Sequence, residues 1–216
     1  MTREVFDDLG GAFNGQEGRK KLFWHLVSEL SVSVFVETGT YRGATTAYVA
    51  ERFRGPIYTC EVDPRYFAAA QQRLSGLPNV QLMLEDSREY LKQLITSGVL
   101  SDRSLLVYLD AHWQWDLPIS GELETLLGVP LSGAVIIDDF QVPGDPSYGF
   151  DDYGPGKKLS LELIHPFRDK ISEVYFPSLR GSDETGRRRG AVIIPLGAHA
   201  RTILSRSELL TGSSLE

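Results

Sequence analysis

The chain has 216 residues, of which 42% are hydrophobic and 24% charged, and its formal net charge is −7. These values are typical of a globular domain; they exclude a coiled coil or a largely disordered chain, and they argue against binding to nucleic acid through overall charge. The single cysteine, Cys60, excludes an internal disulfide and a cysteine-rich zinc site, and it is consistent with a cytoplasmic protein. We expect neither a membrane helix nor, from the acidic first ten residues, a secretory signal.

The predicted elements alternate between helix and strand along the chain. Hydrophobic residues at helical spacing predict a first helix over 16–30, and β-branched and aromatic residues predict a first strand over 32–37. Further helices are expected over 44–53, 64–74, 87–96, 122–127 and 157–168, and further strands over 57–61, 80–84, 105–110, 134–138, 171–176 and 191–195. This alternation predicts a parallel sheet with helices on both faces, which ends in an antiparallel hairpin because no helix separates the last two strands.

The domain organisation follows from the same pattern. Residues 1–197 are expected to form one domain, of which 1–31 are an N-terminal helical extension, and 198–216 a C-terminal tail that is partly disordered. The segment 141–156 is rich in glycine and proline, has no periodicity and carries Tyr148 and Tyr153. A loop of this length is usually functional or disordered, and the tyrosines favour a binding loop.

Acidic residues stand at the end of each of the first five predicted strands. They are Glu37, Glu61, Glu85 with Asp86, Asp110, and Asp138 with Asp139. Ligands of open parallel sheets bind at the carboxyl ends of the strands, so these side chains should share one edge. The row predicts an acidic rim that faces a cationic or metal-bearing ligand.

The turn after the first strand reads Glu37-Thr38-Gly39-Thr40-Tyr41-Arg42-Gly43. Gly39 permits a tight turn, and Gly43 lets the next helix begin close to a ligand. The third glycine of a dinucleotide fingerprint is missing, and a carboxylate at 37 would repel a pyrophosphate but suit an ammonium or sulfonium group. Glu61 lies where an acid commonly binds ribose hydroxyls. Asp86 could bind an adenine amino group or, alternatively, cap a helix.

Together with Leu109-Asp110-Ala111-His112-Trp113, these residues resemble the class I S-adenosylmethionine-dependent methyltransferases. The resemblance implies an α/β, Rossmann-like, doubly wound sheet of seven strands in the order 3-2-1-4-5-7-6, with strand 7 antiparallel. It also implies S-adenosylmethionine as cofactor. The residues expected to bind it are Glu37, Thr38, Gly39, Thr40, Tyr41, Gly43, Thr45, Glu61, Val62, Asp86, Ser87 and Asp110.

Asp110 with Asp138 and Asp139 is similar to the metal-dependent O-methyltransferases of the macrocin and cephalosporin-tailoring type. That resemblance implies Mg²⁺ on these three carboxylates and a small-molecule hydroxyl as acceptor. Three converging carboxylates would repel one another unless a hard cation neutralised them, and such an ion lowers the pKa of a coordinated hydroxyl. Asp110 and His112 are the candidate catalytic residues.

Two alternatives remain open. One is a metal-independent methyltransferase in which His112 is the general base and the acceptor is an oxygen or a nitrogen; Asp138 and Asp139 would then cap a loop or position the substrate. The other is a non-catalytic, nucleotide-binding Rossmann-like module such as a dehydrogenase fragment; Glu37 and the missing third glycine argue against the dehydrogenase. The sequence leaves a homodimer open.

Three loops are expected to surround the acceptor: Trp113–Ile119, Gln141–Gly156 and Pro177–Arg189. All three leave carboxyl ends of parallel strands. Trp113 and Trp115 are either aromatic walls of the acceptor pocket or ordinary packing residues. The arginines of the third loop are a solvated surface or an anchor for an anionic acceptor; they are Arg180, Arg187, Arg188 and Arg189.

Overall fold

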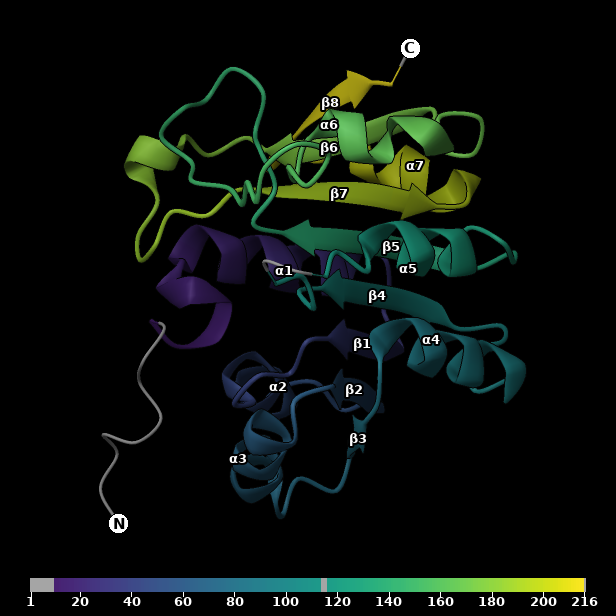
Figure 1. The fold of residues 1–216 in the computed structure, drawn as a ribbon. Coiled ribbons are helices and arrows are strands. Elements are labelled where there is room, and N and C mark those ends of the chain that lie inside the picture. Colours follow the sequence, from purple (N-terminus) through teal and green to yellow (C-terminus); the bar gives the residue numbers. More distant parts are fainter. Residues whose placement is uncertain (1–9, 114–115, 216) are drawn as a thin grey trace.

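The computed structural model describes residues 10–113 and 116–215. Its centre is an eight-stranded sheet in the order β3-β2-β1-β4-β5-β7-β6-β8 (Figure 1). The strands are β1 (Val34–Thr38), β2 (Ile57–Glu61), β3 (Val80–Leu84), β4 (Ser104–Leu109), β5 (Ser132–Asp138), β6 (Glu173–Pro177), β7 (Ala191–Leu196) and β8 (Leu210–Ser214). The first five strands pair in parallel, and β7 is antiparallel to both of its neighbours. The predicted doubly wound fold and the relative order of its first seven strands are therefore confirmed.

Helices cover both faces of the sheet. Residues of α1, α2 and α7 pack on one face, with α3 beside α2, and residues of α4, α5 and α6 pack on the other. Their bounds are α1 (Glu17–Glu29), α2 (Ala44–Ala50), α3 (Pro64–Leu74), α4 (Ser87–Thr96), α5 (Ile119–Leu126), α6 (Leu161–Ile164) and α7 (Ala198–Leu204), with 3₁₀ turns η2 (Ala12–Gly15), η3 (His165–Phe167) and η4 (Gly181–Asp183). None of the helices in the described ranges is long and apolar enough to cross a membrane.

The central strands are apolar on both sides because helices cover both faces of the sheet. β1 is buried along its whole length, as are β4 and β5 except for their first residues. Thr38 pairs with Cys60 on one side and with Leu109 on the other, and Leu109 pairs with Ile137. This register brings the carboxyl ends of β1, β2, β4 and β5 to one edge, on the left of Figure 1.

The expected number of seven strands is wrong. Residues after 197, which we expected to be a partly disordered tail, form α7 and β8. β8 pairs antiparallel with β6 from Glu173–Ser214 to Pro177–Leu210, and Leu210 and Leu215 are buried. This pairing joins distant parts of the chain, so the short polar segment gave no local signal for it.

The helix expected over 157–168 is much shorter in the structure. Only α6 and the adjoining turn η3 are helical, and residues 157–160 are extended against the preceding loop, where Leu159 N donates to Asp151 O at 2.9 Å. Pro166 explains why the α-helix gives way to the 3₁₀ turn η3, because proline has no backbone N–H to continue the α-helical hydrogen bonds.

Candidate active site

The glycine turn after β1 lies directly against the turn after β4. Gly39 has a φ of +78°, and a Cβ at this position would lie 2.3 Å from the carbonyl oxygen of Asp110. Only glycine permits both the backbone conformation and the close approach. Gly43, with a φ of +74°, precedes α2. The sequence-based interpretation of both glycines as turn residues agrees with this geometry.

Glu61 connects the end of β2 to the glycine turn. Its Oε2 accepts a hydrogen bond from the Tyr41 backbone N–H at 2.7 Å, and its Oε1 accepts one from Asp63 N–H at 2.9 Å. Burial raises the pKa of Glu61, against the effect of these N–H donors. The next residue, Val62, is 66% exposed at the same edge.

Glu37 lies beneath the glycine turn and is not part of the open rim. Its carboxylate accepts hydrogen bonds from the hydroxyls of Thr46 and Thr59, the latter at 3.0 Å, and Thr59 also contacts Thr40 at 2.5 Å. Burial raises the pKa of Glu37 to about 7. Its observed role is to support the turn from below.

Asp86 caps α4, which is one of the two roles predicted for it. Its carboxylate accepts from Arg88 N–H at 2.9 Å and forms an ion pair with the Arg88 guanidinium at 2.5 Å. Arg88 also pairs with Asp116 at 2.8 Å. Nearby, Ser87 is buried, and the hydroxyl of Thr45 accepts from Phe13 N–H at 3.2 Å.

Four side chains from the loops after β4 and β5 converge, and we call them the acid cluster: Asp110, His112, Asp139 and Asp151. The His112 side chain is only 1% exposed. Its Nε2 lies 4.0 Å from Asp110 Oδ1, 3.9 Å from Asp139 Oδ2 and 3.7 Å from Asp151 Oδ2. Neither ring nitrogen forms a hydrogen bond with any described residue.

Arg189, from the loop between β6 and β7, closes the cluster on one side. Its Nε donates to Asp139 Oδ1 at 2.6 Å and its Nη2 to Asp151 Oδ1. Burial alone would raise the pKa of Asp139, but His112 and Arg189 lower it. Asp139 has a φ of +51°, an uncommon conformation for a non-glycine residue, and such strain often occurs at functional sites.

The third carboxyl group of the acid cluster, that of Asp110, lies in surroundings that disfavour its ionised form. Desolvation raises the pKa of Asp110 well above its ordinary value, and the negative charges of Asp138 and Asp139 raise it further. The metal-ligating atoms that Asp110, His112 and Asp139 offer all lie within 4.8 Å of one another. The geometry therefore brings together three groups that could hold a cation.

Asp138 does not join them, so of the predicted set of Asp110, Asp138 and Asp139 the structure brings together Asp110 and Asp139. Successive residues at a strand end point to opposite sides, so Asp138 turns away from Asp139. Its carboxylate, in a side chain 1% exposed, is bound by the Arg19 guanidinium, by Tyr108 Oη at 2.5 Å and by Asn14 Nδ2 at 3.2 Å.

The N-terminal segment 12–19 supplies site residues that the sequence analysis missed. Besides Asn14 and Arg19, Gln16 exchanges two hydrogen bonds with the Arg189 backbone, each at 2.9 Å. Glu184 accepts from the backbone N–H groups of Gly18 and Arg19 at the start of α1. Arg19 interrupts the apolar stripe of Leu22, Phe23 and Leu26, and a charge on that stripe was the available signal.

The sequence analysis also missed Glu122, in the first turn of α5. It is 0% exposed, and no described residue forms a hydrogen bond with either carboxylate oxygen; the same holds for the hydroxyl of Thr38. Burial raises the pKa of Glu122, against the opposing influence of the Ser87 and Thr38 hydroxyls and of His112. Glu122 also falls on an apolar stripe, with Ile119, Leu123 and Leu126.

The predicted acceptor residues differ in their surroundings. Trp113 is 66% exposed, whereas Tyr148 is buried and donates from its hydroxyl to Leu179 O at 3.0 Å. Tyr153 donates to Asp151. Trp115 lies outside the described residues. The expected arginine cluster divides: Arg189 is paired in the site, and Arg180, Arg187 and Arg188 are exposed.

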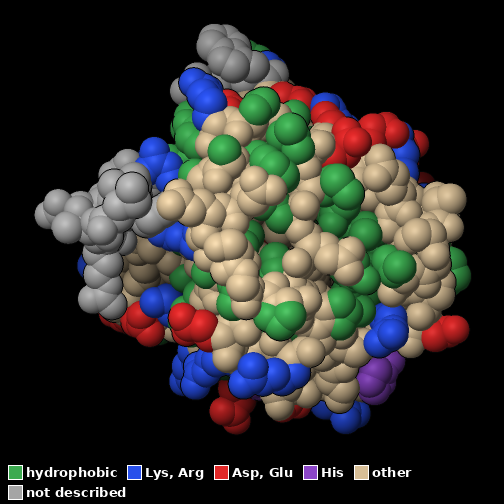
Figure 2. All heavy atoms as spheres, turned by 90° about the horizontal axis from the view of Figure 1, so that it is seen from below, with side chains coloured by type: hydrophobic (Ala, Val, Ile, Leu, Met, Phe, Trp, Pro, Cys, Tyr) green, Lys and Arg blue, Asp and Glu red, His purple; other side chains and the backbone are tan. Residues whose placement is uncertain are grey.

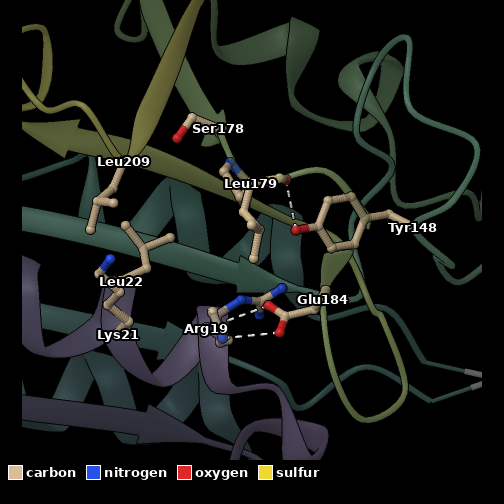
Figure 3. Close-up of a pocket in the computed structure, with 10 residues that line it drawn as sticks. Arg19, Lys21, Leu22, Tyr148, Ser178, Leu179, Glu184 and Leu209 are labelled. Carbon is tan, nitrogen blue, oxygen red and sulfur yellow. Dashed lines mark hydrogen bonds between the residues drawn. The ribbon is translucent and has the colours of Figure 1, made fainter. Parts of the chain in front are cut away.

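A cavity of about 80 Å³ lies beside the site, between α1, the end of β6 and the loop that carries Glu184 (Figure 3). Leu22, Leu179 and Leu209 form its apolar part, and the backbone of Arg19 contributes to its wall. None of the residues predicted to bind the cofactor lines it. The cavity is therefore separate from the acid cluster, none of whose residues lines it.

Comparisons with known proteins identify the fold. A scan against protein-family models finds no matching family, and a search of curated proteins finds no match. A Klebsiella pneumoniae protein assigned as an O-methyltransferase is similar at 16% identity, over 84% of this chain and 81% of its own, with a TM-score of 0.59. A Bacillus cereus O-methyltransferase solved with S-adenosylhomocysteine has the same identity and coverage and a TM-score of 0.58.

A third similar structure is TomG, an O-methyltransferase from Streptomyces achromogenes involved in tomaymycin synthesis and solved with S-adenosylmethionine. It is 17% identical over 83% of this chain and 80% of its own, with a TM-score of 0.55. At these identities the likeness establishes the fold, which is the α/β Rossmann-like fold of these methyltransferases.

Proposed function

We propose that this chain, which has the methyltransferase fold, transfers a methyl group from S-adenosylmethionine to a hydroxyl oxygen of a small molecule. The observation that carries the proposal is the placement of the glycine turn, Glu61 and the acid cluster at one carboxyl edge of the sheet. Two of the similar structures were solved with S-adenosylhomocysteine or S-adenosylmethionine, which supports the same donor here.

The donor side combines polar and apolar groups. Each oxygen of Glu61 accepts one backbone N–H and keeps a lone pair for a ribose hydroxyl. The molecule seen from its β3 edge shows apolar side chains between polar ones (Figure 2). The large exposed apolar residues at the ends of β2 and β3 are Val62, Met83 and Leu84, which suit the face of an adenine ring.

The reaction forms a bond between the acceptor oxygen and the methyl carbon as the carbon–sulfur bond breaks. The bonding electrons pass to sulfur, S-adenosylhomocysteine leaves, and the hydroxyl proton moves to a base. In the metal-free protein Nε2 of His112 is the candidate base in the cluster. Positioning of the acceptor oxygen against the methyl group supplies the catalysis, and the surrounding negative charge favours binding of the sulfonium.

The Mg²⁺ site implied by the resemblance does not fit this arrangement. It needs three free carboxylates, but Arg19, Tyr108 and Asn14 already bind Asp138. We therefore derive no step through an ion bound to Asp110, Asp138 and Asp139.

Donor binding tests the proposal. S-adenosylhomocysteine at about 100 times its dissociation constant should stabilise the fold by roughly 2.7 kcal/mol, a rise in melting temperature of about 5–10 °C. Glu61→Ala should lose most of this shift, whereas Glu51→Ala, at an exposed position after α2, should keep it. A shift with NAD and none with S-adenosylhomocysteine would contradict the proposal.

A further inference from the structure

We infer that the acid cluster is a mixed imidazole–carboxylate site for a first-row transition-metal dication, with His112 as a ligand in place of Asp138. The inference deepens the proposed function and rests on it for the role of the ion in transfer. Ion binding itself needs no donor, so the two can be tested separately.

The distances fit a shared ion. Transition metals bind imidazole nitrogen and carboxylate oxygen at about 2.0–2.2 Å, so two ligand atoms on one ion lie roughly 3–4 Å apart. His112 Nε2 lies 3.7–4.0 Å from an oxygen of Asp110, Asp139 and Asp151. These separations are too long for hydrogen bonds and are those expected of ligands around one ion.

His112 supplies an independent argument. Buried polar atoms nearly always have a hydrogen-bond partner, yet neither ring nitrogen of this side chain has one among the described residues. A histidine held only for packing would donate to a carbonyl or a hydroxyl nearby. Here Nε2 instead faces three carboxylates, those of Asp110, Asp139 and Asp151.

Arg189 orients two of the oxygens. It occupies Oδ1 of Asp139 and Oδ1 of Asp151, and the Oδ2 atoms of both residues face His112. Oδ2 of Asp151 also accepts from the Tyr153 hydroxyl, so Asp110 and Asp139 are the carboxylate ligands proper. Asp151 is also held to the strand end, because its N–H donates to Asp139 O at 2.9 Å. The carboxylates therefore have fixed orientations before any ion arrives.

The charges match a dication. Asp110, Asp139 and Asp151 together carry three negative charges when ionised, and Arg189 supplies one positive charge. The remaining charge of minus two equals that of one divalent cation. Asp138 adds nothing to this sum, because the buried guanidinium of Arg19 neutralises it.

The ligand types select the kind of ion. Mg²⁺ prefers oxygen ligands in octahedral geometry, whereas imidazole suits zinc, iron and other transition ions. A site of one histidine and two or three carboxylates should thus prefer Mn²⁺ or Zn²⁺ to Mg²⁺. If an ion were bound, His112 would be a ligand and not the base, and the ion would supply a Lewis acid that makes an acceptor hydroxyl more acidic.

Titration calorimetry tests the inference on the full chain, treated with a chelator and free of donor. Mn²⁺, Zn²⁺ and Mg²⁺ are titrated as separate probes. The electron paramagnetic resonance of Mn²⁺ is a second readout. We expect one ion per chain and an affinity for Mn²⁺ or Zn²⁺ at least about tenfold above that for Mg²⁺. His112→Asn should weaken Mn²⁺ binding by about 10–100-fold and remove the preference over Mg²⁺. His199→Asn, which alters an exposed histidine on α7, should leave both unchanged.

Two further variants allow the inference to be tested even if His112→Asn does not fold. Asp139→Asn should weaken Mn²⁺ binding, and Asp138→Asn, checked by its melting curve, should retain it. The inference would be overturned if the wild type bound neither Mn²⁺ nor Zn²⁺, or if it preferred Mg²⁺. It would also be overturned if Mn²⁺ binding survived His112→Asn but not Asp138→Asn. The melting shift with S-adenosylhomocysteine reports separately on the proposed function.

Discussion

The buried pair of Arg19 and Asp138 shows how single residues decide which groups are available to a ligand. Both side chains are 1% exposed, and Tyr108 and Asn14 complete the hydrogen bonds of the carboxylate. A buried pair of this kind is strongly destabilised when one partner is lost, because the other charge remains without compensation. The pair removes Asp138 from the acid cluster.

Arg19→Met should therefore lower the free energy of unfolding by about 3–5 kcal/mol. Lys92→Met is the control: Lys92 pairs with Glu89 on the surface, a contact worth at most about 1 kcal/mol. Chemical denaturation measures both. A loss below about 1 kcal/mol for Arg19→Met would show that the pair does not hold Asp138 as described.

Glu37 gives a prediction about pH. Burial raises its pKa to about 7 from the ordinary 4.5, so between these values the folded protein holds a proton that the unfolded chain has released. Its contribution to stability is complete below pH 4.5 and is lost as the pH rises through 7, on the order of 3 kcal/mol in total. Glu37→Gln should flatten this decline.

Unfolding free energies at several pH values between 4 and 8 measure the effect. Glu29→Gln, at an exposed position on α1, should leave the slope of the wild type unchanged. An equal slope in wild type and Glu37→Gln would show that Glu37 ionises in the folded protein without cost.

At the scale of residues, sequence reasoning succeeded at positions where the local backbone conformation and packing permit only one residue type. Gly39 is such a case, since both its φ and its contact with Asp110 require glycine. It failed for Asp138, because its partner Arg19 lies far away in the chain and only the fold brings them together. His112 and Asp139 were both singled out, but their convergence depends on loop geometry that spacing does not encode.

At the scale of elements, β8 is the clearest test of the described fold. It covers the outer edge of β6 along five residue pairs and buries Leu210 and Leu215. A chain shortened to end after residue 205 should lose at least about 3 kcal/mol of stability, since two buried leucines are removed. The exposed edge of β6 should also promote aggregation.

Thermal unfolding and light scattering of the shortened chain measure these effects. Removal of residue 216 alone is the control and should change neither. If the chain that ends after 205 melts and scatters like the full chain, these residues do not close the sheet.

The elements that sequence patterns located best are those whose local composition matches their burial. β1, β4 and β5 have continuous apolar runs, and their predicted ranges differ from the observed ones by at most two residues at either end. The length of α6 was overestimated because apolar spacing continues through Pro166, which lacks the N–H that an α-helix needs and lies in the 3₁₀ turn η3. β8 was missed because its pairing with β6 is entirely non-local.

At the scale of the whole molecule, the order of the strands determines which side chains lie together at the carboxyl edge of the sheet. The parallel register of β1, β2, β4 and β5 places Glu61 and the acid cluster at one edge, and the N-terminal segment and the loop with Glu184 close that edge from the β7 side. The order of the first seven strands could be predicted from the resemblance. The docking of residues 12–19 could not, because it depends on contacts with a loop more than 160 residues later.

Methyl transfer itself is the most direct measurement. The metal-loaded protein would be incubated with S-adenosylmethionine labelled in its methyl group and with a panel of small hydroxyl and amine compounds, and the products analysed by mass spectrometry and nuclear magnetic resonance. Our account predicts labelled methyl ethers together with S-adenosylhomocysteine in equal amounts, both lost in Glu61→Ala and retained in Glu51→Ala. Label on nitrogen alone, or no transfer by a protein that also fails to bind S-adenosylhomocysteine, would contradict it.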